Sequence, residues 1–265
     1  MTNPPVFAAM TVALYCRLTS SQYIMDTHPP ALYSRKWSWT VPLQRWMARG
    51  ALMNITDQAH FKRLFESWGA MCMALENPPS DSPDYDQTIR PESMCFEIAV
   101  VNTFAVDEPL DIILEAARQL PDVRFSIMGD TTRGDKAMIA CAPPNVVFTG
   151  YLLREAYWNC LARSRAVMVL TTYPNSLLGG AQDGVVMGKP LLLSRQPTLT
   201  EFFTKGTVFV ENTTEGLIEG ISQVRANEQR LLSEVADFEI EQAAAWEENF
   251  KELDAFVCAY LEPAR

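Results

Sequence analysis

Residues 173–194 read YPNSLLGGAQDGVVMGKPLLLS; the apolar run Ala166–Leu170 precedes them, and a second apolar run, Leu191–Leu193, lies at their end. The pattern predicts a strand that ends at Thr171-Thr172, a helix that begins near Ala181 and ends at Gly188, and a further strand over Leu191–Leu193. Single helices between apolar strands are typical of a parallel sheet with both faces covered. The stretch therefore favours an α/β fold.

The same alternation of strand and helix continues on both sides of this stretch. Further apolar strands are predicted at Cys95–Val101, Val123–Ile127, Val146–Phe148, Ala166–Leu170 and Val208–Val210. Between the first two, Leu110, Ile113, Leu114 and Ala117 have helical spacing. We therefore predict that residues 94–229 form a Rossmann-like, doubly wound parallel sheet.

The residues before this domain predict a smaller and truncated amino-terminal α/β domain over residues 1–77. Three strands are expected in it, at Tyr23–Met25, Leu52–Thr56 and Met71–Leu75, and Asp57 is expected to cap the helix after the second strand. A linker is predicted over residues 78–93. Residues 230–265 predict a long helix that packs back on the first domain, the alternative being a helix that covers its own domain.

The composition excludes several classes of protein. The chain has 265 residues, of which 48% are hydrophobic, and its 32 acidic and 22 basic side chains give a net charge of −10. A disordered tail, a fibre and a basic nucleic-acid wrapper are excluded, and no nucleic-acid partner is expected. The six cysteines are scattered without a CxxC pair, so we expect reduced thiols and a cytoplasmic protein rather than a zinc site.

The polar stretch ENPPSDSPDYDQTIRPES, residues 76–93, is rich in proline. Its Asp84-Tyr85-Asp86 matches the Asp-x-Asp pair that holds a divalent metal in some nucleotide-sugar enzymes. Such a pair must lie at a strand end that faces a site, whereas this one lies in a connector. We therefore expect a solvated linker and no metal site.

The common catalytic motifs are missing, since no GxGxxG follows a strand and no Walker loop, GxSxG or HExxH occurs. Dehydrogenases, P-loop enzymes and hydrolases of the usual types are therefore disfavoured. Gly179 and Gly180 precede a helix whose free amides attract a phosphate, and Asp183 has the chemistry to bind ribose hydroxyls. The alternative is that the glycines allow tight packing and Asp183 complements the helix dipole.

Three segments in order resemble a known family. TFAVDEPLDIILEAARQLPDVRFSIMGD (103–130), PPNVVFTGYL (143–152) and residues 173–194 resemble the nucleotide-binding half of GT-B glycosyltransferases of the retaining, group 1 or family-four type. YIMDTHPP and Trp37-Ser38-Trp39 resemble the later part of that family's acceptor domain. The resemblance implies transfer of a sugar from a nucleoside diphosphate sugar to a glycan, glycoconjugate or lipid-linked acceptor, with retention and without a metal or a cofactor.

The resemblance also implies roles for particular residues. The base would lie near the Val147–Tyr151 turn, the ribose near Asp183 and the diphosphate near Gly179-Gly180. The donor contacts implied are Asn102, Thr103, Arg133, Gly150, Tyr151, Gly179, Gly180 and Asp183. Asp26 and His28 would lie near the transferred sugar, and Asn175 would take the place of the first carboxylate of the family's E-x7-E pair.

The departures from the family favour a second hypothesis. Asn175 is an amide and Asp183 is one methylene shorter than glutamate, and the loop Asn102–Glu108 lacks the family's basic pair. Arg133, Lys136 and Arg195 are candidate replacements, whereas Lys189 is explained as a charge complement at the end of the preceding helix. The alternative function is thus a degenerate, non-catalytic subunit or nucleotide-binding protein, with a sugar-nucleotide epimerase as a third reading.

The amino-terminal region leaves two partners open. The short first domain indicates a shortened acceptor domain, a fragment, or a subunit that a partner chain completes. VFAAMTVALYC, residues 6–16, is too short to span a bilayer and predicts a helix packed into the domain, the alternative being a membrane-surface helix. A peripheral membrane contact is therefore kept open.

Overall fold

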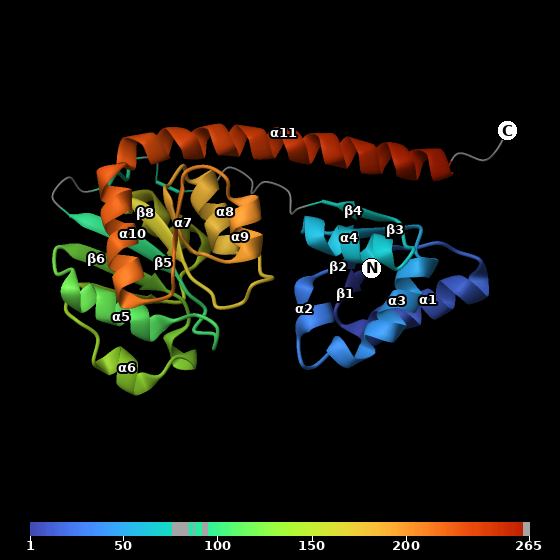
Figure 1. Ribbon diagram of the computed structural model, residues 1–265, viewed down its shortest axis with the longest axis horizontal. Helices are drawn as coiled ribbons and strands as arrows, with labels where there is room; N and C mark the ends of the chain where they lie inside the picture. Colours follow the sequence, from blue (N-terminus) through green and yellow to red (C-terminus); the bar gives the residue numbers. More distant parts are fainter. Residues whose placement is uncertain (76–84, 87, 92–94, 262–265) are drawn as a thin grey trace. The chain divides into compact units, whose positions relative to one another are not determined.

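The computed structural model describes residues 1–75, 85–86, 88–91 and 95–261. The chain forms two compact units, residues 1–78 with 243–265, and residues 79–242 (Figure 1). Most of the expected linker 78–93, including Asp84 of the Asp-x-Asp match, lies outside the described residues. Asp86 is exposed, and its carboxylate accepts hydrogen bonds from the backbone N and the hydroxyl of Thr88.

The second unit contains the predicted doubly wound parallel sheet. Its strands are β5 (Phe96–Val101), β6 (Val123–Met128), β7 (Val146–Gly150), β8 (Ala166–Val169), β9 (Leu191–Ser194) and β10 (Thr207–Val210), in the order β10-β9-β8-β5-β6-β7. All neighbouring pairs are parallel. The chain runs outward from β5 to β7 and then returns to β8 on the other side of β5, so the strand order reverses between β5 and β8.

Helices cover both faces of this sheet. They are α5 (Leu110–Gln119), α6 (Lys136–Ala140), α7 (Arg154–Arg163), α8 (Gly179–Val186), α9 (Pro197–Phe202) and α10 (Thr214–Ala226). Alternate residues of β5 enter two different cores: Ile98 and Val100 pack in the one with α5 and α10, and Ala99 in the one with α7, α8 and α9. This alternation explains why the central strands are mostly apolar, with Glu97 as the charged residue of β5.

The described residues of the first unit form four parallel strands, so the expectation of three is wrong. They are β1 (Thr2–Asn3), β2 (Ile24–Thr27), β3 (Met53–Thr56) and β4 (Cys72–Ala74), in the order β1-β2-β3-β4. Strand β1 has two residues, too few to show a period of two, and α1 (Val6–Thr19) follows it. Helices α2 (Pro29–Tyr33), α3 (Val41–Gly50) and α4 (Ala59–Ser67) complete the unit around a core that includes Phe61 and Phe65.

The last helix, α11 (Glu228–Leu261), contributes to both units. Residues 228–242 belong to the second unit, where Val235 and Phe238 are buried in its core. Residues 243–261 belong to the first unit, where Leu253 packs with Met53 and Met73. Within the described ranges, no helix is both apolar and long enough to cross a membrane.

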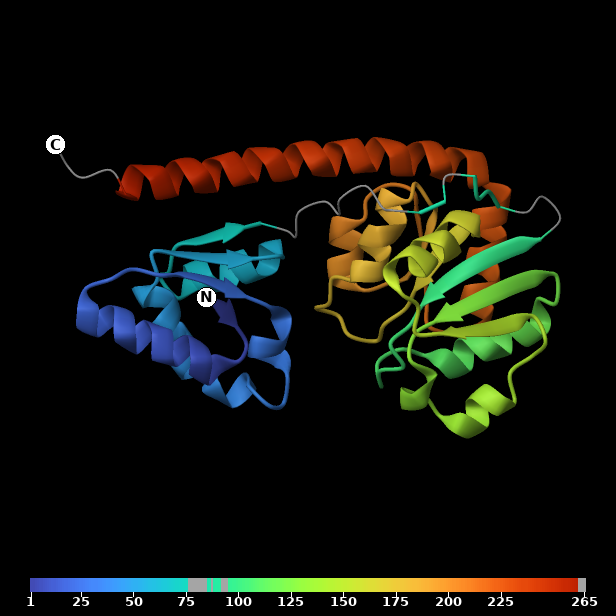
Figure 2. The ribbon, with the colours of Figure 1, turned by 180° about the vertical axis from the view of Figure 1, so that it is seen from behind.

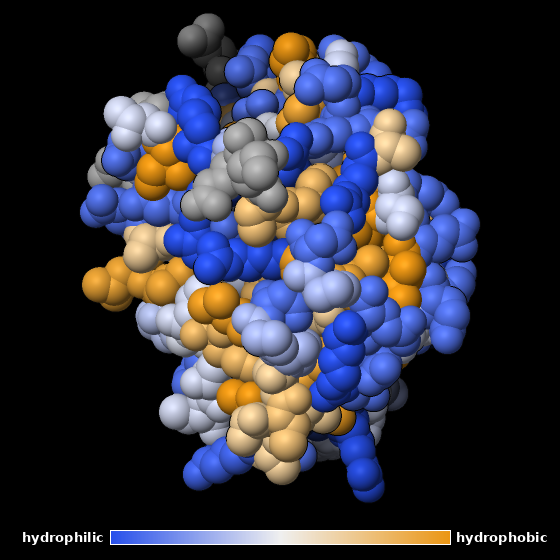
Figure 3. Space-filling model, turned by 90° about the vertical axis from the view of Figure 1, so that its left-hand side faces the viewer, coloured by the Kyte–Doolittle hydropathy of each residue, from blue (hydrophilic) through white to orange (hydrophobic). Residues whose placement is uncertain are grey.

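Hydrophilic and hydrophobic residues are interspersed on the side of the molecule seen in Figure 3. Such mixing is normal for a globular protein, because polar atoms are too few to cover the whole surface.

Candidate functional site

The candidate donor site lies at the carboxyl ends of β5 and β8, where the strand order reverses. Ligands of open α/β sheets bind at such a point. The loops after these two strands are joined by Asp107, whose carboxylate accepts from the Thr171 hydroxyl at 2.6 Å and whose carbonyl accepts from Thr172 N at 2.8 Å. Thr171 N also donates to Ser194 Oγ at 2.9 Å, so buried polar contacts fix the loop that leads into α8.

The two glycines at the start of α8 have different roles. Helix α8 begins at Gly179, two residues earlier than predicted, and a Cβ at this position would meet nothing within 4 Å. A Cβ at Gly180 would lie 2.6 Å from Val101 Cγ1, so this glycine lets the helix pack against β5. Gly179 therefore has the open backbone that a phosphate needs, whereas Gly180 is explained by packing.

Asp183 lies on α8 and accepts a hydrogen bond from the Tyr157 hydroxyl at 2.6 Å. Burial raises the pKa of Asp183, and the hydrogen bond from Tyr157 opposes that rise. The pKa of Tyr157 is also raised, first by burial and then by the charge of Asp183. Tyr157 thus orients the carboxylate, a role that the sequence did not reveal because it lies on a different helix.

In the loop after β5, the carboxylate of Glu108 accepts hydrogen bonds from other residues of the same loop. The Glu108 carboxylate accepts from Thr103 N at 2.7 Å, Ala105 N at 3.0 Å and the Thr103 hydroxyl at 3.0 Å. Asn102 is buried, and its Oδ1 accepts from Phe104 N at 2.8 Å. The backbone N and the hydroxyl of Thr103, which were expected to contact the donor, therefore already donate to Glu108 within the loop. The family has a basic pair in this loop.

The other predicted donor residues lie along the same edge of the sheet. Gly150 ends β7 with a φ of +71°, and the following Tyr151 is 79% exposed. Arg133 is exposed in a short helical turn after β6. Asn175 lies in the loop between β8 and α8 and is itself engaged in an interaction. These residues follow different strands along this edge, and Tyr151 lies two strands away from β5.

The candidate replacements for the basic pair are partly committed elsewhere. Arg195 pairs with Glu211 at 3.1 Å and donates to the Phe209 carbonyl. Lys189 Nζ donates to the carbonyls of Ala162 and Ser164 at 2.7 and 2.9 Å, which lie at the end of α7. Lys189 therefore complements the end of α7, so the prediction that it complements the preceding helix α8 is wrong. Burial lowers the pKa of Lys189 to about 8. Lys136 begins α6.

In the first unit, Asp26 and His28 lie at the carboxyl end of β2. His28 Nε2 is 3.3 Å from Asp26 Oδ2, and this hydrogen bond raises the pKa of His28. Asp57, which follows β3, does not cap α4: Gln58 is at the cap position, and Asp57 Oδ1 is buried without a hydrogen-bond partner. Burial raises the pKa of Asp57, and the charge of His28 opposes the rise.

The carboxyl ends of the first three strands are polar. Asn3, Thr27 and Thr56 are the last residues of β1, β2 and β3, and all three are buried. Each has a side-chain oxygen without a hydrogen-bond partner. Buried polar atoms normally have partners, water included, so this edge is suited to bind water or a hydroxylated ligand beside His28.

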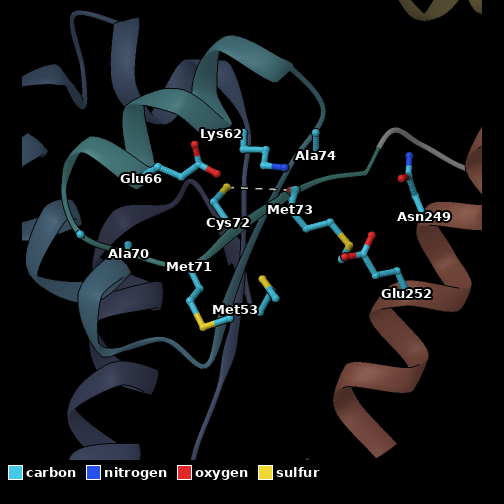
Figure 4. A pocket seen from close by; sticks show the side chains of 11 residues that line it. Met53, Lys62, Glu66, Ala70, Met71, Cys72, Met73, Ala74, Asn249 and Glu252 are labelled. Atoms are coloured by element: carbon cyan, nitrogen blue, oxygen red, sulfur yellow. Dashed lines mark hydrogen bonds between the residues drawn. The ribbon is translucent and has the colours of Figure 1, made fainter.

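A separate cavity of about 620 Å³ lies beside the edge strand β4 (Figure 4). Met53, Met71 and Met73 point toward it, Lys62 and Glu66 come from α4, and Asn249 and Glu252 come from α11. It contains no residue predicted to bind donor or acceptor. Among the residues that the structure describes, no group of three or more His, Cys, Asp or Glu side chains is arranged to hold a metal ion.

Comparison with protein families supports the predicted type of fold. The family model described as glycosyl transferase-like matches residues 111–249, which include α8 and Asp183. The chain belongs to this glycosyl transferase-like family. No curated protein matches it closely enough in sequence to count as a relative.

Solved structures show the same GT-B fold. HepE from Anabaena, in complex with UDP-glucose, has a TM-score of 0.72 at 13% identity over 94% of this chain and 77% of its own. A glycosyltransferase from Rickettsia africae has a TM-score of 0.68 at 14% identity over 98% and 83%. Sucrose-phosphate synthase from Thermosynechococcus elongatus has a TM-score of 0.69 at 12% identity over 93% and 70%.

Proposed function

We propose that the glycosyl transferase-like chain transfers a sugar from a nucleoside diphosphate sugar to a glycan, glycoconjugate or lipid-linked acceptor. The observation that carries this proposal is the start of α8, with open backbone at Gly179 and an oriented carboxylate at Asp183. Helix amides favour the negative diphosphate, and the carboxylate accepts hydrogen bonds from ribose hydroxyls. The complex of the similar HepE with UDP-glucose supports this donor class.

In the proposed reaction the bond between the anomeric carbon and the diphosphate oxygen breaks, a bond to an acceptor hydroxyl oxygen forms, and the hydroxyl proton passes to the leaving diphosphate. The positive end of α8 stabilises charge on the leaving diphosphate, so the reaction needs no metal ion. Asp26 and His28 bind near the transferred sugar, and Asn175 hydrogen-bonds to its hydroxyls. We propose that the anomeric configuration is retained, as the resemblance to the retaining family implies.

A specific observation favours the alternative of a non-catalytic, nucleotide-binding subunit. The Glu108 carboxylate occupies the amides of the β5 loop, which lacks the family's basic pair. An acid next to a diphosphate raises the cost of binding it, and Asn175 cannot stabilise a developing positive charge as a carboxylate does. A chain of this kind would bind a nucleotide without turnover, or act together with a second chain.

The test combines binding with turnover. A panel of nucleoside diphosphates and their sugars is screened by thermal shift, and release of nucleoside diphosphate is then measured with and without a chelator. The proposal predicts stabilisation by one donor, chelator-resistant turnover, and loss of both binding and turnover in Asp183→Ala. Product NMR then reports the anomeric configuration. Binding without turnover for any acceptor supports the non-catalytic alternative, and no binding at all contradicts both.

A further inference from the structure

The outer face of α1 has an apolar stripe that the described residues of the first unit leave exposed, apart from ring contacts of Phe7 with Trp37 and Trp39. Val6, Ala9, Ala13 and Cys16 form the buried face of this helix. Phe7, Leu14 and Leu18, at i, i+7 and i+11, share the opposite face, and Tyr15 lies beside them. These four side chains are 43–86% exposed. In Figure 2, α1 crosses the front of the first unit with no other element of that unit before it.

The stripe continues into the segment after α2. The Phe7 ring centroid lies 5.8 Å from that of Trp37 and 6.2 Å from that of Trp39, and Trp39 is 68% exposed. Tyr15 and Trp39 combine an apolar ring with a polar atom, the type of side chain that is enriched where protein meets the lipid headgroups. We call the five exposed residues Phe7, Leu14, Tyr15, Leu18 and Trp39 the α1 surface.

Positive charges flank the α1 surface at both ends. Lys36 Nζ lies 5.0 Å from the centre of the Trp37 ring. At the other end, Arg17 and Arg49 line a cavity of about 440 Å³ together with Trp46, Ser20 and Ser21. No acidic residue occurs before Asp26, and residues 1–56 contain five basic side chains and one acidic one in a chain of net charge −10.

We propose that the α1 surface docks on an anionic phospholipid membrane. The apolar side chains enter the interface between headgroups and acyl chains, while Arg17, Arg49 and Lys36 attract the anionic headgroups. The sign of the flanking charges decides between occupants: a second copy would bring the same positive charges together, whereas anionic lipid complements them. The proposal does not rest on the function proposed above, because membrane binding is measured without donor or acceptor.

The test is co-flotation of the full chain with vesicles of phosphatidylcholine alone and of phosphatidylcholine mixed with phosphatidylserine. Binding is expected only to the mixed vesicles and should weaken at high ionic strength. Leu14→Glu with Leu18→Glu should abolish it, and Arg17→Gln and Lys36→Gln should each weaken it about fivefold, since one basic residue near the surface contributes ~1 kcal/mol.

Matched controls come from the second unit and α11. Ile240→Glu changes an equally exposed apolar residue, and Lys251→Gln removes an exposed basic one, so neither should alter flotation. Circular dichroism checks that each variant folds. The proposal is overturned if no vesicle binds the chain, or if the α1 variants float with the vesicles as the original chain does. It is also overturned if the original chain is a dimer in solution and the variant Leu14→Glu with Leu18→Glu is a monomer.

Discussion

The hydrogen bond from Tyr157 to Asp183 provides a test of the proposed donor site. Tyr157→Phe removes the hydroxyl but keeps the ring beside Trp158. Because that hydrogen bond lowers the pKa of Asp183, its loss should raise this pKa further. As the pH is lowered, the variant should therefore lose donor affinity at a higher pH than the original chain does. Isothermal titration of nucleoside diphosphate across pH measures the change.

Asp183→Asn is the companion variant. It should reduce donor affinity by about 10- to 100-fold, the value of a hydrogen bond to a charged group, and should remove the pH dependence. Unchanged affinity in Asp183→Asn would show that the carboxylate does not contact the donor.

Gly179 and Gly180 provide a comparison of two neighbouring positions. Gly180→Ala places a methyl group against Val101, so it should destabilise the second unit by about 1–3 kcal/mol. Gly179→Ala meets no atom within 4 Å and should leave stability nearly unchanged while weakening diphosphate binding. Chemical denaturation and ligand titration of both variants separate the two effects. Equal loss of affinity without loss of stability would contradict the assignment of Gly180 to packing.

His28 provides a pH prediction in the first unit. Asp26 raises the pKa of His28, so this pair stabilises the fold below the ordinary histidine pKa and the effect disappears as pH rises through the raised value. Asp26→Asn should therefore lower the pKa of His28. The chain has two histidines, His28 and His60, so the ring signals are simple to follow by NMR. A pKa unchanged by Asp26→Asn would show that the pair does not form in solution.

At the scale of elements, α11 provides a stability test with a control on the same helix. Phe238 is buried in the core of the second unit, and Phe238→Ala should destabilise that unit by about 3–5 kcal/mol. Ile240 is 69% exposed, and Ile240→Ala should change stability by less than about 0.5 kcal/mol. Because the chain has two units, hydrogen exchange of each unit is a better measure than one melting temperature.

The elements also show what a sequence can reveal. Every strand of the second sheet was predicted, because mostly apolar strands and helical spacing are local signals. The two-residue β1 was missed because its partner β2 defines it. The polar partners of the candidate site were missed for a related reason: Tyr157 and Asp183, or Thr171 and Asp107, meet only after folding. Asp57 was misassigned because an acid before a helix usually caps it.

For the molecule as a whole, donor binding should increase the free energy of unfolding of the second unit and not that of the first. A nucleoside diphosphate at about 100 times its dissociation constant should stabilise the second unit by ~2.7 kcal/mol. Hydrogen exchange should slow in α8 and in the loops after β5 and β8. The loops after β2 and β3 should be protected only when the transferred sugar is also present. Protection confined to the first unit would contradict a donor site at α8.

The shared helix α11 has a consequence for biosynthesis. Residues 1–78 leave the ribosome first, yet their unit also needs residues 243–261, among them Leu253. At 5–20 residues per second, translation of the intervening second unit takes about 10–30 s. During this interval Met53 and Met73 lack their contact with Leu253. A nascent chain stalled before residue 243 should therefore be the form that depends most on a chaperone.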